Sequence, residues 1–202
     1  MQRILIVLFA SSLFGVVLAQ PGLDLPFRKG LLGAAVMLAL AWGARSHWAE
    51  SADAPEAPER RALLSLFGTM VVLAHLMTSL WQIGPAMDLH SPASHAMGTD
   101  SWILVGASLL MGWMARAPGP SGDERDRHIA ANAMLLGHYG LLLQLLLFVL
   151  WLAFGRGTVL EQMSRAMLAQ LLICFWIVSC VIHEVTCLYA YARDRRWAGE
   201  AE

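Results

Sequence analysis

Charged side chains are scarce in this sequence. Asp, Glu, Lys and Arg make up 14% of its 202 residues, and lysine occurs only once, at Lys29. Soluble domains carry charge on about a quarter of their residues. The formal net charge of -1 excludes the strongly basic surface that nucleic-acid binding requires. Hydrophobic residues fill 57% of the chain, more than a soluble domain of this size buries. We therefore predict an integral membrane protein, with the lipid bilayer as its surroundings.

Cysteine and catalytic motifs are also sparse. The three cysteines, Cys174, Cys180 and Cys187, all lie in one apolar segment, which excludes a secreted disulfide framework. The sequence has no nucleotide-binding glycine loop, no serine nucleophile elbow and no His-Glu-x-x-His motif. No polar stretch is long enough to house a soluble catalytic domain. Nothing in the sequence therefore indicates an enzyme.

Six apolar runs are candidates for crossing a membrane. A spanning helix needs about 20 apolar residues, and shorter runs can span where flanking residues snorkel or the bilayer thins. The second and fourth runs are marginal in length. The runs are 4–19, 30–48, 62–83, 101–115, 129–154 and 166–192. We predict an all-α membrane protein, one polytopic domain over residues 1–202, with six transmembrane helices arranged as three hairpins.

The distribution of cationic residues predicts the orientation, because Arg and Lys are retained on the cytoplasmic side. Only four lie at the predicted outer side: Arg28, Lys29, Arg156 and Arg165. Ten lie at the other side: Arg3, Arg45, Arg60, Arg61, Arg116, Arg125, Arg127, Arg193, Arg195 and Arg196. Both termini are therefore predicted to lie in the cytoplasm, in a multi-pass protein of a bacterial inner membrane.

The first apolar run allows a second interpretation. A basic start, Met1-Gln2-Arg3, and small residues at Val17-Leu18-Ala19 also describe a cleavable secretory signal. Its removal would leave five spans and an N-terminus outside.

Ionisable groups inside the predicted spans are few, and each is a candidate functional residue because burial in hydrocarbon is costly. His138 lies eleven residues from Arg127, and His183 lies ten from Arg193. At 1.5 Å per residue both are about 15 Å deep, near the middle of the bilayer. They are therefore predicted to lie at one level on consecutive antiparallel helices.

The last span carries Cys180, His183, Glu184 and Cys187 at spacings that share one helix face. With His138 these side chains could bind a transition metal. His138 and His183 could instead be the two axial ligands of a haem b. His183 and Glu184 could handle protons, or all these groups could simply hydrogen-bond across the bundle. The sequence leaves these four alternatives open, so the cofactor is unknown.

The predicted outer loop between the third and fourth spans contains Met87, His90, His95 and Met97. Thioether and imidazole together are typical of a periplasmic copper site, although a solvated loop explains the same residues. A polar track of His75, Ser79 and Gln82 on one helix face leads toward this loop.

The fifth span carries Ala133, Gly137, Gly140 and Gln144 on one face. Small residues allow close helix contact, and a glutamine can hydrogen-bond across it. This pattern predicts a helix-packing face, either inside the bundle or toward a partner.

Charged runs flank the last two spans. Asp123-Glu124-Arg125-Asp126-Arg127-His128-Ile129 precedes them, and Tyr191-Ala192-Arg193-Asp194-Arg195-Arg196 closes them. Over about residues 120–196 the chain resembles a family of small uncharacterised prokaryotic membrane proteins, domain of unknown function 2178, in which an Asp-Glu-Arg-x-Arg run precedes a helical hairpin. Those proteins generally have fewer helices, so the first hairpin here is a departure. The resemblance implies a membrane hairpin and assigns no catalytic residue.

The leading functional interpretation is a non-enzymatic accessory subunit that packs against other membrane-protein subunits or against itself. A haem- or metal-binding redox protein that uses the intramembrane histidines is the first alternative. A small transporter or proton-conducting module is the second.

Overall fold

The computed structural model describes residues 2–22, 26–51, 55–115, 123–155 and 157–200. These residues form six long helices and one short helix, and they contain no strand. The helices are α1 (Gln2–Ala19), α2 (Lys29–Glu50), α3 (Ala57–Ile83), α4 (Pro92–Met114), α5 (Glu124–Phe154), α6 (Thr158–Glu161) and α7 (Arg165–Glu200). Each predicted apolar run lies in one long helix, apart from the last residue of the run 101–115. Three arginines used for the orientation are not counted below, because Arg116 and Arg156 lie outside the described residues and the side chain of Arg196 is not described.

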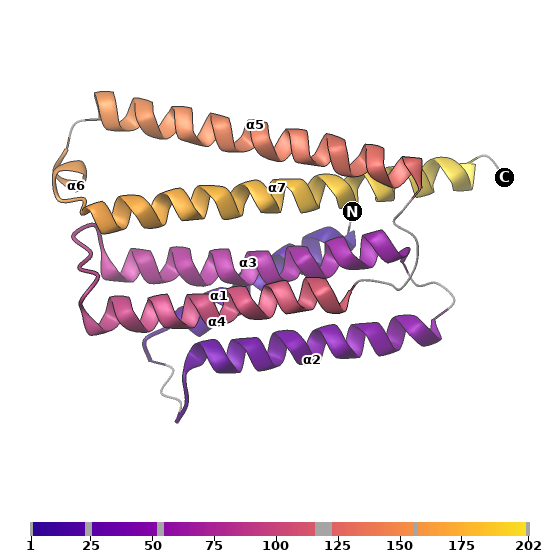
Figure 1. Cartoon of the computed structure of the whole chain (residues 1–202), viewed down its shortest axis with the longest axis horizontal. Helices are drawn as coiled ribbons and strands as arrows, with labels where there is room; N and C mark the ends of the chain where they lie inside the picture. The colour runs from indigo at the N-terminus through magenta and orange to yellow at the C-terminus, as the bar shows by residue number, and fades with distance from the viewer. Residues whose placement is uncertain (1, 23–25, 52–54, 116–122, 156, 201–202) are drawn as a thin grey trace.

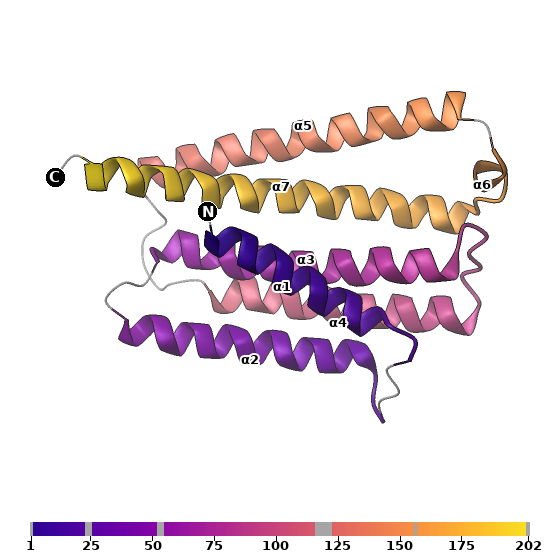
Figure 2. The same ribbon diagram turned by 180° about the vertical axis from the view of Figure 1, so that it is seen from behind.

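Five of the long helices lie side by side in one layer, in the order α2, α4, α3, α7 and α5 (Figure 1). The remaining helix, α1, crosses one face of this layer obliquely (Figure 2). Successive long helices run in opposite directions, so the N- and C-termini lie toward the same end of the bundle. We call this the terminal end, and the opposite one the far end.

Four helices are long and apolar enough to cross a membrane: α1, α3, α5 and α7. Neither α2 nor α4 reaches the same combination of length and hydropathy. The first nine residues of α4 include Ser94, His95 and Asp100, and the last turns of α2 are polar. The prediction of six transmembrane helices is therefore supported for four of them.

The start of α4 differs from the predicted start at Ser101. The helix begins at Pro92, because the Ser91 hydroxyl accepts a hydrogen bond from the Ser94 amide at 3.2 Å and Pro92 occupies the first turn. A serine cap followed by proline is a favourable helix start. As a result, Asp100 lies more than two turns inside a helix and is not part of a loop.

The prediction that the first two helices pack together as a hairpin is wrong. α1 packs mainly against α3, and α2 packs against α4, whereas α1 and α2 touch only slightly. Small residues explain this arrangement, because they let backbones approach closely. A Cβ atom at Gly15 would lie 2.6 Å from the Val71 carbonyl oxygen of α3, and one at Gly33 would lie 2.5 Å from the Leu104 side chain of α4. The other two pairs, α3 with α4 and α5 with α7, do pack as hairpins.

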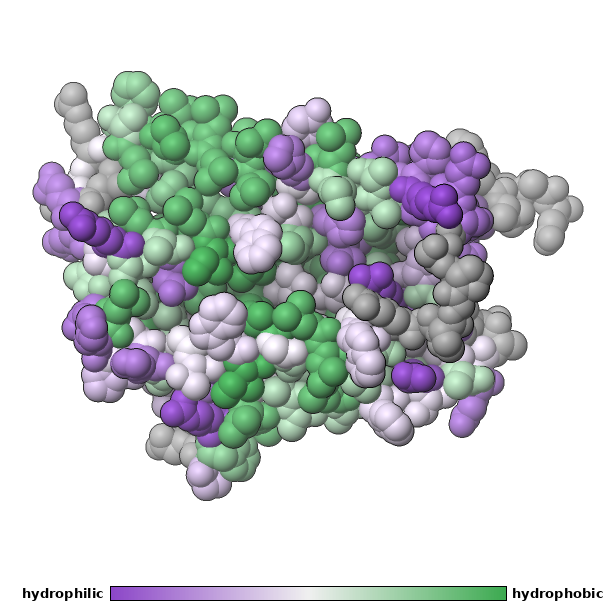
Figure 3. All heavy atoms as spheres, viewed as in Figure 1, coloured by the Kyte–Doolittle hydropathy of each residue, from purple (hydrophilic) through white to green (hydrophobic). Residues whose placement is uncertain are grey.

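The core lies around α3, which contacts α1, α4 and α7. Leu66 and Val71 of α3 are completely buried, as are Leu104 and Met111 of α4. On α5, by contrast, only Ile129, Ala133 and Gly137 are buried. α5 forms one edge of the layer and exposes a long leucine-rich surface. In Figure 3 hydrophobic residues predominate between the two ends of the bundle, and hydrophilic residues gather at both ends, as a bilayer-embedded surface requires.

Candidate functional site

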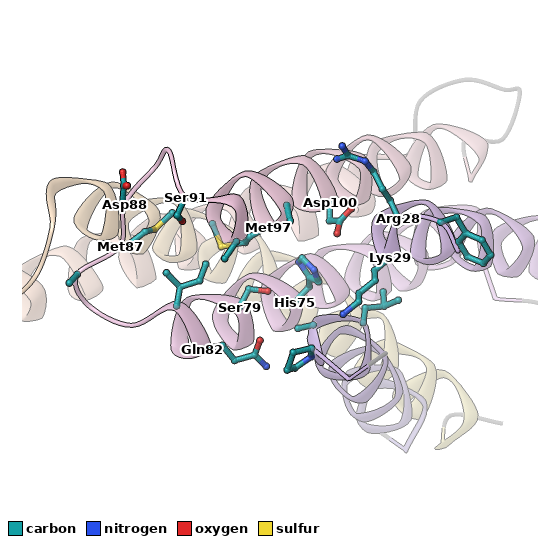
Figure 4. A pocket seen from close by; sticks show the side chains of 18 residues that line it. Arg28, Lys29, His75, Ser79, Gln82, Met87, Asp88, Ser91, Met97 and Asp100 are labelled. Atoms are coloured by element: carbon teal, nitrogen blue, oxygen red, sulfur yellow. The ribbon is translucent and has the colours of Figure 1, made fainter. Parts of the chain in front are cut away.

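A cavity of ≈ 910 Å³ lies at the far end, between the end of α1, the start of α2, the end of α3 and the start of α4 (Figure 4). Apolar residues such as Leu18 and Met97 form part of its wall. Charged and polar side chains also line it, namely Arg28, Lys29, His75, Ser79, Gln82, Asp88, Ser91 and Asp100.

Asp100 is the most unusual residue of this wall. It is only 9% exposed, and its Oδ1 atom has no hydrogen-bond partner within the described part of the chain. A Cβ atom at Gly30 would lie 2.7 Å from the Asp100 Cα and 2.9 Å from Oδ1. Gly30 therefore allows the N-terminal turn of α2 to press against Asp100, where the positive end of the helix dipole favours a carboxylate.

His75 lies near Asp100 and is also buried, at 3% exposure. Its Nδ1 atom lies 3.4 Å from the Ser101 hydroxyl, and the tautomer decides which of the two donates. Among the described residues, the other ring nitrogen, Nε2, has no hydrogen-bond partner. One edge of the imidazole is thus held by α4 while the other is available to the cavity.

The polar track predicted on α3 lies along this cavity. His75 and Ser79 are buried in the wall, and Gln82 is exposed one turn beyond them. In Figure 4 the three side chains follow one another along α3. Lys29 extends toward the same space from α2, and its Nζ donates to the Gln20 carbonyl oxygen.

The face of α7 that carries Cys180, His183, Glu184 and Cys187 lies elsewhere in the bundle. Glu184 accepts a hydrogen bond from Ser65 of α3, with 2.7 Å between Oγ and Oε1. The His183 Nε2 and Cys187 Sγ atoms lie 3.8 Å apart on α7 itself. The Ser65–Glu184 hydrogen bond joins α3 to α7, and the two contacts together occupy part of the predicted ligand set.

His138 does not join that set. It is exposed on α5, whereas its neighbour Gly137 faces α7, where an added Cβ would lie 3.4 Å from the His183 Cβ. Successive residues of a helix are turned by about 100°, so His138 is directed away from the contact that holds His183. Within the described residues, no group of three or more His, Cys, Asp or Glu side chains could hold a metal ion.

The candidate copper ligands of the outer segment do not face one space. Met87 and Met97 are buried in an apolar cluster with Leu76 and Cys174. His90 is exposed and lies 3.5 Å from the Asp88 carboxylate, and His95 is exposed on the first turns of α4. The thioethers therefore serve as core side chains and the imidazoles are solvated or at the surface.

The predicted packing face of α5 lies against α7. Ala133 is completely buried, and a Cβ at Gly140 would lie 2.5 Å from the Ile182 side chain. At Gly137, the backbone carbonyl accepts a hydrogen bond from Ser179 at 2.8 Å. Gln144 differs from the expectation, because its amide donates to Gly140 of its own helix at 3.0 Å and not across the contact.

Charged residues form a network at the terminal end. Arg195 donates to Glu59 over 2.7 Å, although Glu59 is only 4% exposed. Arg125 pairs with Asp194 at 3.1 Å and also approaches Glu56 at 3.5 Å. The network ties α7 to α3 and α5.

The sequence does not single out Ser65, and it identifies Lys29 only as a cationic residue at the outer side. Asp100 directly precedes the predicted start of the fourth span at Ser101, at the end of the predicted outer loop. The serine cap at Ser91 is the one local feature that places Asp100 inside a helix.

Comparison of the chain with protein-family models, with curated proteins and with solved structures finds no match. The resemblance to domain of unknown function 2178 therefore stays a prediction.

Proposed function

We propose that this chain is a six-span protein of a bacterial inner membrane that acts as an accessory subunit, binding another membrane protein through the outer face of α5. The exposed position of His138 on that face is the observation that carries this proposal.

The placement of cationic residues supports the orientation. Eight described arginines lie at the terminal end and three cationic residues lie at the far end. The two groups are Arg3, Arg45, Arg60, Arg61, Arg125, Arg127, Arg193 and Arg195 against Arg28, Lys29 and Arg165. The positive-inside tendency then places the terminal end in the cytoplasm.

The lengths of α2 and α4 support their inclusion as spans. They have 22 and 23 residues, which correspond to about 33–35 Å of helix and match a hydrocarbon core of about 30 Å. Both lie in the same layer as α3 (Figure 1). α4 packs between α3 and α2, and these contacts lower the apolar surface that each helix must present to lipid.

His138 lies near the middle of α5, among apolar side chains that share its face. Met134, Leu135 and Leu142 are all about half exposed or more, and their spacing of three or four residues from His138 forms one stripe. An imidazole in hydrocarbon loses its hydrogen bonds to water, which makes a lipid-facing position unfavourable. A second membrane helix covering this stripe would remove that cost.

The partner is therefore a transmembrane helix of another protein, with a hydrogen-bonding side chain such as Ser, Thr, Asn or Glu at the middle of the bilayer. Helix association in membranes depends on packing and interhelical hydrogen bonds more than on burial of apolar area. The leucine-rich stripe would supply the packing and His138 the hydrogen bond.

Photocrosslinking in native membranes tests this proposal. A photoreactive amino acid at His138 is expected to give a discrete adduct with another membrane protein. The matched control is Leu143, which is 56% exposed on α5 and turned about 140° away from His138. Only lipid adducts at both positions, or equal protein adducts at both, would contradict the proposal.

A further inference from the structure

We propose that the cavity at the far end binds a small zwitterion of the amino-acid type, with its ammonium group at Asp100 and His75 and its anionic group toward Lys29. This site is separate from the α5 face, and it does not depend on the accessory function.

Asp100 would bind the cationic group of the ligand. A buried acceptor without a hydrogen-bond partner costs about 1–3 kcal/mol, and more when it is charged. Within the described residues no side chain offsets this cost at Oδ1. Oδ1 lies against Gly30, and because the terminal torsion of an aspartate is soft, a rotation of the carboxylate on ligand binding would turn this oxygen toward the cavity. A ligand ammonium, with its three donors, is the complement of such a carboxylate.

His75 and Ser79 extend the polar wall beside Asp100. The Nε2 edge of His75 can accept a further proton donor when the Nδ1 edge is held by Ser101. The Ser79 hydroxyl is buried one turn away and lines the same space. A carboxylate, an imidazole and a hydroxyl are therefore all available as acceptors for an ammonium group on this side of the cavity.

Lys29 would bind the ligand's anionic group, and Arg28 adds a second positive charge at the start of α2. Both line the cavity from the start of α2, and in Figure 4 the Lys29 side chain extends toward α3 whereas the Arg28 side chain extends in the opposite direction. The Lys29 ammonium uses one donor on the Gln20 carbonyl, which leaves two for a ligand. The formal charges of the lining residues are two positive, Arg28 and Lys29, and two negative, Asp88 and Asp100, so a ligand without net charge matches the cavity.

Size and surroundings agree with an organic molecule. A volume of ≈ 910 Å³ falls within the range of small-molecule sites, roughly 300–1,000 Å³. Leu18 and Met97 offer apolar wall for a carbon skeleton. The described residues provide no set of three His, Cys, Asp or Glu ligands for a metal ion, so the ligand's own ammonium is the favoured cation.

The test is a ligand-binding measurement on the purified full chain in detergent. Each common amino acid is added singly, and intrinsic tryptophan fluorescence is followed during heating. At least one is expected to raise the melting temperature. Its N-acetyl derivative should lose the effect, because acetylation removes the cationic donor, and its carboxamide should bind more weakly. A panel without any shift, or equal binding of the N-acetyl form, would overturn the proposal.

Variants locate the ligand in the cavity. Asp100→Asn is expected to weaken binding about tenfold to a hundredfold, because a hydrogen bond to a charged group is lost. Glu184→Gln is the matched control, since it removes a carboxylate from a different part of the bundle, and it should leave the affinity within about twofold by the same reasoning. If Asp100→Asn fails to fold, the comparison of derivatives on the parent chain decides. Unchanged binding by a folded Asp100→Asn variant would contradict the site.

Discussion

Ser65 of α3 donates its hydroxyl proton to the Glu184 carboxylate of α7 over 2.7 Å, across 119 positions of sequence. This single hydrogen bond crosses the contact between the two helices and gives Glu184 a donor inside the bundle. It shows that a carboxylate placed within a candidate span can serve to hold helices together.

The loss of this hydrogen bond should destabilise the protein. Ser65→Ala removes the donor and leaves the Glu184 oxygen unsatisfied, which should lower the free energy of unfolding by about 1–3 kcal/mol. Unfolding by a denaturing detergent in mixed micelles, followed by circular dichroism, measures the change. The control is Ser46→Ala, because the exposed Ser46 hydroxyl bonds only to its own helix at Trp42. Equal stability of the two variants would contradict the prediction.

Gly15 should be essential for the contact of α1 with α3. A methyl group there would lie 2.6 Å from the Val71 carbonyl oxygen, which belongs to the backbone and cannot move aside easily. Gly15→Ala should therefore cost about 1–3 kcal/mol, as overpacking does. Gly43→Ala, on α2, meets nothing within 4 Å and should instead stabilise the helix by about 0.5–1 kcal/mol. The same unfolding assay distinguishes the expected destabilisation by Gly15→Ala from the expected stabilisation by Gly43→Ala. An unchanged stability of Gly15→Ala would contradict the prediction and show that α1 can shift freely.

Arg195 and Glu59 should be energetically coupled. Glu59 is almost completely buried, so Arg195→Ala would leave its carboxylate without its 2.7 Å partner. We expect a loss of about 1–3 kcal/mol, discounted because Arg195 is partly exposed and solvent screens it. The double variant with Glu59→Gln should recover part of that loss in a double-mutant cycle. Strictly additive effects would mean that the pair contributes nothing.

Haem binding through His138 and His183 is not expected. His138 is exposed on α5, and His183 lies behind Gly137 beside Cys187. The absorption spectrum of the purified protein should therefore lack a Soret band, and supplementing the growth medium with a haem precursor should not produce one. A Soret band that disappears in His138→Ala would restore the redox alternative.

The number and approximate positions of the long helices follow from the sequence alone. The side chains of each of the six runs are apolar and favour a position out of water. This preference belongs to each residue and does not depend on which helices pack together. The concentration of arginine at alternate run ends is also local, and it predicts that successive helices run in opposite directions, as they do in the structure. Even the packing face at Gly137 and Gly140 is visible as a spacing of small residues.

Which helices touch, and which polar groups meet, depended on the tertiary structure. Hydropathy does not specify the rotation of a helix about its axis or the angle at which it crosses its neighbour. The rotation of α5 and α7 in the bundle leaves His138 exposed and places His183 in the contact between them. α1 pairs with α3 because Gly15 allows close backbone contact. No residue near Gly15 in the sequence predicts which helix it will contact. Asp100 became a cavity residue because the Ser91 cap extends α4 and because Gly30, seventy positions earlier, leaves room for it. Local sequence sets the solvent preference of a segment, whereas the meeting of distant side chains is decided only when whole helices pack.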